Sequence, residues 1–89
     1  MKIKLELFGA SRDFSDKGHL ELEVQDKASI DDLRNEIIKY LDKNFNGNEN
    51  FIIVVKSSAF CSENNEIISD NYKITKDQKI GIIPPIGGG

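Results

Sequence analysis

The hydrophobic residues of this chain change their spacing at Ser29, and this change limits the folds that the chain can adopt. Before Ser29, apolar residues recur at every second position, first over 3–7 and again over 20–24. After it, apolar residues recur at helical spacing, at Ile30, Leu33, Ile37 and Leu41. A period of two is typical of a strand with one buried face, and the longer spacing is typical of an amphipathic helix. The sequence therefore predicts two strands followed by a helix.

Local signals set the bounds of these elements. Turn residues fill the segment from Gly9 to Gly18, and so short a connection predicts an antiparallel hairpin. We expect Phe14, inside this connection, to anchor it on the core. The helix is predicted over 30–43, with Ser29 as its cap. Its first turn holds Asp31 and Asp32. Adjacent helical side chains point in different directions, so these two carboxylates are not interpreted as a catalytic pair. We interpret them as residues that the electropositive start of the helix favours.

The second half of the chain is predicted to complete a sheet. Residues 51–55 form a continuous apolar run, interpreted as a strand that is covered on both faces or meets a partner with its second face. A brief strand is predicted at 67–68 and a last strand at 79–83, with the rest of 56–71 unassigned. This order predicts an α+β domain with one main helix on a mixed sheet of four to five strands.

Composition and charge narrow the class of protein. The 89 residues are enough for one domain, and the net charge is -3. Basic residues are scattered singly among acids, so nucleic acid is not expected as a partner. No stretch approaches the roughly 20 apolar residues of a membrane span, and residues 1–9 alternate instead of forming a signal peptide. We therefore expect a cytoplasmic protein that has no membrane partner.

The side chains offer no set that is typical of catalysis or metal binding. His19 is the single histidine and cannot hold a metal alone. Cys61 is the single cysteine, so an internal disulfide is impossible, and we interpret it as an ordinary buried or half-buried residue. The sequence contains no H-E-x-x-H, C-x-x-C or G-x-S-x-G motif and no phosphate-binding glycine loop. We expect no metal and no self-sufficient enzyme.

The most informative stretch is the C-terminal tail of residues 84–89, which we separate from a domain of residues 1–83. Pro84 and Pro85 favour an extended stem, and three glycines without side chains can enter a narrow channel. The expected reactive group is the α-carboxylate of Gly89. Activation as an acyl-adenylate would make it electrophilic, and a sulfur donor could then convert it to a thiocarboxylate. A frayed end is the simpler alternative, but it has no need for a stiff stem that carries the apolar Ile86.

Three segments of the sequence resemble the small subunit of molybdopterin synthase, in the MoaD and ThiS family of ubiquitin-like sulfur carriers. Residues 7–12 (LFGASR) are similar to the end of the first strand in that family, and residues 29–33 (SIDDL) to its helix start. Residues 77–89 carry the most specific match, with a turn, last strand, double proline, aliphatic residue and terminal glycines. Gly87 stands where the family usually has Ala or Ser, and the segment 56–71 is longer and more polar than the family pattern.

The resemblance implies a ubiquitin-like β-grasp fold, with the first and last strands parallel in the middle of the sheet. It also implies that a MoeB-like E1 enzyme adenylates Gly89 with ATP, and that a sulfur donor system supplies sulfur. The tail, including Pro84, Pro85, Ile86, Gly87 and Gly88, would enter a MoaE-like large subunit. There the thiocarboxylate would donate sulfur to cyclic pyranopterin monophosphate in molybdenum cofactor biosynthesis. The chain itself is expected to hold no permanent cofactor.

An apolar surface for these partners is expected on the sheet. The candidates are Phe8, Phe60, Ile83 and the second face of 51–55, and the alternative for Phe8 and Phe60 is that they fill a second small core. Other functions remain open at this point. The chain could carry sulfur for thiamine or for Urm1-like tRNA thiolation, modify protein lysines through Gly89 as ubiquitin does, or be an interaction domain with an inert tail.

Overall fold

The first and last strands of the described chain lie side by side at the centre of the main sheet. A computed structural model describes residues 1–85. β1 (Lys2–Leu7) and β7 (Gln78–Ile83) pair in parallel. β2 (His19–Glu23) pairs antiparallel with β1, which confirms the predicted hairpin. The five-stranded sheet has the order β2-β1-β7-β4-β5 and is mixed, as predicted.

The other strands are short. β4 (Ala59–Cys61) runs antiparallel to β7, within the segment that the sequence left unassigned. β5 (Ile67–Ile68) pairs with β4 at the sheet edge, which confirms the predicted brief strand. β3 (Ala28–Ser29) and β6 (Lys73–Ile74) form a separate two-stranded sheet, so the strand before the helix is tied to the segment before β7.

α1 (Ile30–Phe45) begins where the hydrophobic period changes and ends two residues beyond its predicted end. Ser29 caps the helix, because its Oγ accepts a hydrogen bond from the Asp32 N–H at 3.1 Å. The Ser29 N–H in turn donates to Asp32 Oδ2 at 2.9 Å, which completes a capping box. The helix ends at Asn46, whose left-handed backbone conformation directs its N–H to the Leu41 carbonyl.

Asp32 makes the start of α1 sensitive to acid. Hydrogen bonds from the backbone N–H and the side chain of Ser29 lower the pKa of Asp32 from its usual value of 3.8, and the charge of Lys73 lowers it further. A carboxyl whose pKa is lower in the folded chain stabilises the fold above its unfolded pKa, and this stabilisation is lost as the pH falls through the folded pKa. We expect the melting-temperature difference between wild type and Asp32→Asn, followed by circular dichroism, to be constant well above pH 3.8 and to shrink below it. A difference that persists unchanged in acid would contradict this role.

The apolar run at 51–55 is helical, so the strand predicted there is wrong. It forms most of α2 (Glu49–Ser57), which Asn48 caps by accepting hydrogen bonds from the N–H groups of Asn50 and Phe51 at 3.0 and 3.2 Å. Helical spacing buries Val55 and leaves Ile53 61% exposed. A short continuous apolar run has no period that separates a strand from a helix, and here the cap favours the helix.

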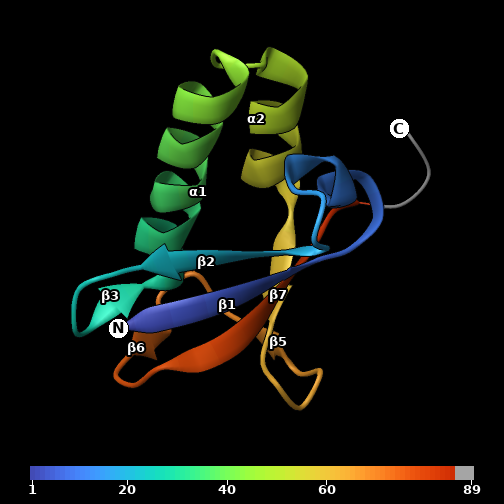
Figure 1. Cartoon of the computed structure of the whole chain (residues 1–89). Helices are drawn as coiled ribbons and strands as arrows, with labels where there is room; N and C mark the ends of the chain where they lie inside the picture. Colours follow the sequence, from blue (N-terminus) through green and yellow to red (C-terminus); the bar gives the residue numbers. More distant parts are fainter. Residues whose placement is uncertain (86–89) are drawn as a thin grey trace.

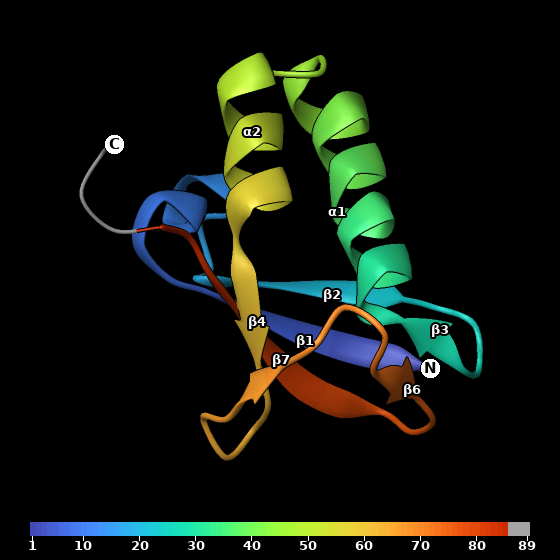
Figure 2. The same ribbon diagram turned by 180° about the vertical axis from the view of Figure 1, so that it is seen from behind.

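Both helices lie on one face of the sheet. Figures 1 and 2 show α1 and α2 as a hairpin above the strands, so the core fills the space between the helices and the sheet. The 3-10 helix η1 (Gly9–Phe14) closes one end of this core, and Phe14 is fully buried, as predicted. The fully buried apolar residues of the two layers are Ile3, Leu5, Phe60, Ile80 and Ile82 from the main sheet and Ile30, Leu33, Ile37, Leu41 and Val55 from the helices. Within residues 1–85, no helix has the length and apolar character that a membrane span requires.

Candidate functional site

The predicted reactive tail begins where β7 ends. Pro84 is buried and Pro85 is exposed, so the first proline packs on the domain and the second does not. In Figures 1 and 2, the end of β7 lies beside η1. The remaining tail residues that the sequence singles out, Ile86, Gly87, Gly88 and Gly89, lie outside the described residues. The described part of the site is therefore the root of the tail and the surface around it.

The segment from Phe8 to Ser11 makes a tight turn against this root. The buried Ser11 hydroxyl accepts a hydrogen bond from the Phe8 N–H at 2.9 Å and donates one to the Phe8 carbonyl at 2.7 Å. Gly9 follows with a φ of 54°, a left-handed conformation that glycine adopts without strain. A Cβ atom at Gly9 would lie 3.9 Å from two ring carbons of Pro84, so Gly9 is a close neighbour of the proline ring.

An apolar patch covers the outer face of the sheet beside the tail root. We define it by Phe8, Ala59, Cys61, Ile67 and Ile83. The sheet register places Ala59 opposite Ile83 and Cys61 opposite both Ile67 and Gly81, so these side chains share one face. Phe8 is 43% exposed and Ile67 is 67% exposed, whereas Cys61 is buried beneath its neighbours.

Gly81 allows the patch to close over β7. A Cβ atom on Gly81 would lie 2.8 Å from the Cys61 sulfur and 2.9 Å from the Phe8 ring, closer than packed atoms approach. The missing side chain therefore leaves the space in which the Phe8 ring and the Cys61 thiol meet the strand. Because Phe8 comes from the end of β1 and Cys61 from β4, the patch joins segments that are far apart in the sequence.

Phe60 does not belong to this surface, and its predicted role at a partner interface is wrong. It is only 1% exposed and lies in the core. The register explains this burial, since Phe60 pairs with the buried Ile82, and neighbours along a strand point to opposite faces. Phe8 and Ile83, the other two predicted interface residues, do lie together in the patch.

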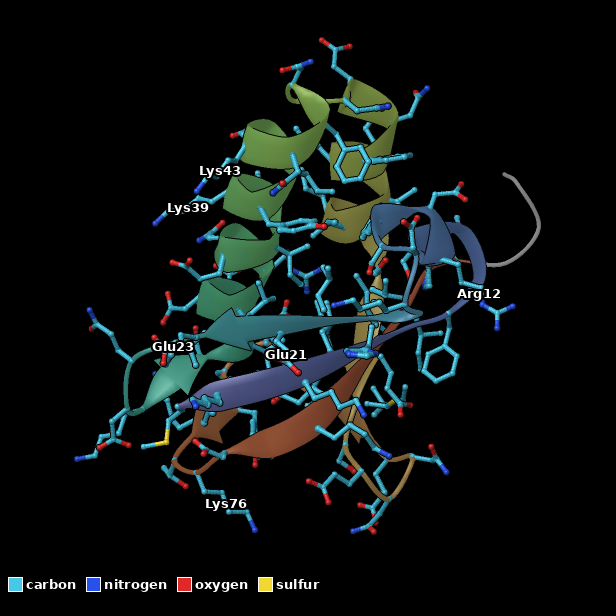
Figure 3. All side chains as sticks on the ribbon, in the orientation of Figure 1. Arg12, Glu21, Glu23, Lys39, Lys43 and Lys76 are labelled. Carbon is cyan, nitrogen blue, oxygen red and sulfur yellow. The ribbon has the colours of Figure 1, made fainter. Side chains whose placement is uncertain are left out.

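The rest of the outer face is charged. Lys2 and Lys4 of β1 lie opposite Glu23 and Glu21 of β2, and Figure 3 shows these two glutamates along β2. Lys79 of β7 forms an ion pair with Glu6 at 3.2 Å. An open hollow of about 850 Å³ lies over this charged half. Its lining is largely exposed lysine and carboxylate side chains, so we place the functional surface at the apolar half, next to the tail.

His19 and Cys61 are too far apart to act as a catalytic pair. His19 lies on β2 and Cys61 on β4, with β1 and β7 between them. Three strand spacings amount to about 14 Å, which exceeds hydrogen-bond reach severalfold. Among residues 1–85, no group of three or more His, Cys, Asp or Glu side chains is placed to hold a metal ion.

Arg34 organises the helix end behind the patch, a role that no sequence motif predicts. Its side chain is 11% exposed and donates to the carbonyls of Val55 and Ser58 at 2.7 and 2.9 Å. A further hydrogen bond joins it to Asp70 at 2.7 Å, and its guanidinium lies 4.9 Å from the centre of the Phe60 ring. One cation thus joins α1 to the C-terminal end of α2, where the helix dipole favours positive charge.

Comparison with solved structures establishes the fold. SAMP1 from Haloferax volcanii gives a TM-score of 0.68 at 14% identity, with 100% of both chains covered. A Pyrococcus furiosus protein provisionally named molybdopterin converting factor, subunit 1, gives 0.70 at 19% identity, with 97% of this chain and 99% of that chain covered. Ubiquitin from Caldiarchaeum subterraneum gives 0.60 at 20% identity, with 100% and 98% covered. The architecture is therefore the predicted ubiquitin-like β-grasp fold, with α2 and η1 in addition to the main helix.

The sequence of the chain was also compared with models of protein families. The model of the ThiS family matches residues 5–89, from the first strand to the last glycine. A search of curated proteins found no match.

Proposed function

The chain belongs to the ThiS family, and from this membership we propose that it is a sulfur carrier whose reactive group is a thiocarboxylate on Gly89. The family match itself carries the proposal, because it continues through the double proline to Gly89. The buried Pro84 and the adjacent apolar patch support it, since they join the root of the tail to a surface that a partner enzyme can bind.

The chemistry needs no side chain of the carrier. In the first step, a carboxylate oxygen of Gly89 attacks the α-phosphorus of ATP and pyrophosphate leaves, on an E1-like, MoeB-like adenylyltransferase. In the second step, hydrosulfide released by a sulfur donor system attacks the acyl carbon, the bond from this carbon to the AMP oxygen breaks, and AMP leaves. Loss of the sulfur-bound proton gives the thiocarboxylate. The free energy for forming the thiocarboxylate therefore comes from ATP. The carrier contributes only the acyl group at the end of its C-terminal tail.

We propose molybdopterin synthase as the destination of the sulfur. The double proline followed by Ile86 resembles the molybdopterin type of carrier most closely, and a structural relative bears the name of a molybdopterin converting factor subunit. In this proposal, a MoaE-like large subunit accepts the tail, and the thiocarboxylate donates its sulfur to cyclic pyranopterin monophosphate. Water then cleaves the bond between the acyl carbon and the sulfur, which leaves the sulfur on the acceptor and returns Gly89 to a carboxylate. Carriers for thiamine or for tRNA thiolation would use the same tail chemistry with other acceptors.

The apolar patch is the proposed contact with both enzymes. Phe8 and Ile67 expose large apolar side chains on the face that adjoins the tail root. Burying a fully exposed side chain of this kind stabilises a complex by about 1.5–3 kcal/mol, and Phe8 and Ile67 would contribute about half of that each, because they are already partly covered. A partner that covers the patch also brings the root of the tail close to its own surface.

Intact mass spectrometry of the protein isolated from its own cell tests the proposal. A fraction of the chains should carry one sulfur in place of one oxygen, and peptide mapping should place the change at the C-terminal peptide. Cys61 is the only cysteine, so a Cys61→Ser variant controls for sulfur bound at the thiol. Conjugates to other proteins would favour a ubiquitin-like modifier instead, and the absence of both species would favour an inert tail.

A further inference from the structure

We infer that the segment Phe8–Phe14 positions the tail, because it holds Pro84 at the point where β7 ends. This inference rests on the proposed function, since it concerns the arm that carries Gly89. It adds a role for residues that take no part in the chemistry and that lie at least seventy positions before the tail in the sequence. In this role, the segment fixes where the arm starts and in which direction it leaves the domain.

The segment contacts the end of β7 at two points. Phe8 lies over Gly81, since a Cβ atom there would come within 2.9 Å of its ring. Gly9 lies along the Pro84 ring, since a Cβ atom on Gly9 would be 3.9 Å from the ring carbons Cγ and Cδ. Residues 81–84 are therefore held from one side by two consecutive residues, and the φ of Pro84 is fixed by its own ring.

The conformation of Phe8 and Gly9 is itself fixed. Ser11 is fully buried, and its hydroxyl binds both the N–H and the carbonyl of Phe8. The Ser11 N–H donates to the same carbonyl at 3.1 Å. Three hydrogen bonds thus close the turn, and Gly9 holds the left-handed φ of 54° that the turn requires.

The far end of the segment is attached to both helices. The fully buried Phe14 packs against Phe51 of α2, with ring centroids 5.1 Å apart. The Tyr40 hydroxyl of α1 donates to the Phe14 carbonyl at 2.9 Å. The segment therefore links the tail root to the helix hairpin and cannot shift without disturbing both helices.

The attachment matters because a small rotation at the root of the tail causes a large displacement of the reactive atom at its tip. Residues 85–89 span at most about 17 Å when fully extended, so a swing of about 20° at the root would move the tip by about 6 Å. A misplacement of only about 1 Å can cost roughly 100-fold in rate. A fixed root limits the positions that the tip of the tail can reach, so fewer unproductive positions compete with the one that a partner enzyme needs.

Gly9→Ala tests the inference, with Gly18→Ala as the matched control. Both glycines have a left-handed φ, 54° and 76°, so both substitutions introduce the same kind of backbone strain. A Cβ atom at Gly18 would meet nothing within 4 Å, whereas Gly9 adjoins Pro84. The Cβ atom added in Gly9→Ala would make only an ordinary contact with Pro84, so the effect must come from backbone strain. Relief of this strain would shift residue 9 and its proline neighbour, whereas relief of the same strain at position 18 would shift nothing near the root. Ser11→Ala is a second test variant in case Gly9→Ala does not fold.

The first measurement is ¹⁵N relaxation in the isolated protein, which reports motion on the picosecond to nanosecond scale. Because Pro84 and Pro85 have no amide hydrogen, the Ile86 N–H is the first reporter beyond the root. We expect its order parameter to fall in Gly9→Ala and to match wild type in Gly18→Ala. Equal order parameters at Ile86 in the two variants would overturn the inference.

The second measurement is pyrophosphate exchange into ATP by the cognate adenylyltransferase, with the carrier as the varied substrate. A loosened root lowers the fraction of competent conformers, so Gly9→Ala should raise KM about threefold to tenfold with little change in kcat. An unchanged KM would count against the inference. If even the wild-type carrier supports no exchange, the proposed function fails, and the relaxation comparison still decides whether the segment holds the root.

Discussion

Deletion of Gly89 alone should abolish thiocarboxylate formation and sulfur transfer. The truncated chain still ends in glycine, but its acyl carbon is withdrawn by about 3.5 Å, the length of one extended residue. Because a misplacement of about 1 Å can cost roughly 100-fold, we expect transfer to fall by about 100-fold or more. The assay is the conversion of the carrier by its adenylyltransferase and sulfur donor, followed by intact mass.

The same deletion should leave the folded domain unchanged. All core residues of the described chain lie between Ile3 and Ile82, so the free energy of unfolding should stay within about 0.5 kcal/mol of wild type. Gly87→Ala is the length-matched control. It keeps the terminal carboxylate in place and inserts the small residue that the family usually has, so it should retain transfer. Full transfer by the truncated chain would show that Gly89 is not the carrier residue.

Arg34→Ala should clearly lower the stability of the fold. The substitution removes a nearly buried charge that binds the carbonyls of Val55 and Ser58 at the end of α2. It also leaves Phe60 without the guanidinium above its ring. Asp70, the carboxylate partner of Arg34, is exposed, so the loss comes mainly from the carbonyls that are left without a donor, which costs about 1–3 kcal/mol. Urea denaturation should show this loss as a lower midpoint with an unchanged slope.

Two further variants test whether the stability loss in Arg34→Ala comes from the buried hydrogen bonds of the guanidinium. Arg12→Ala removes an exposed arginine on η1, at the surface in Figure 3, and should change stability by no more than about 0.5 kcal/mol. Arg34→Lys keeps the charge but not the planar fork, so it should lie between Arg34→Ala and wild type. A loss below about 1 kcal/mol in Arg34→Ala would mean that the carbonyls find other donors.

Elements with a clear period could be predicted from the sequence. The alternation in β1 and β2, the helical spacing in α1 and the proline stop after β7 all agree with the structure. Each signal is local, because it depends on which face of one element is buried. The parallel pairing of β1 with β7 is not local, and it was expected only through the resemblance to a family.

The wrong predictions concern segments whose local sequence pattern is compatible with two structures. The run at 51–55 lacks a period, and Asn48, which caps α2, is equally typical of a turn. Phe60 faces the core because β4 pairs in one register with β7, and a shift of one residue would turn it outward. Arg34 binds carbonyls 21 to 24 positions away, so no local motif reveals its role.

The central position of β7 has a consequence for the making of this protein. β1 leaves the ribosome first, but its parallel neighbour is synthesised more than seventy residues later, so the middle of the sheet stays open until Gln78–Ile83 has emerged. Contacts between such distant segments form late and slowly. The same late segment carries Pro84 directly behind β7, so the apolar patch and the root of the tail are completed in one step. An activating enzyme that recognises this surface would therefore act only on chains whose sheet has closed.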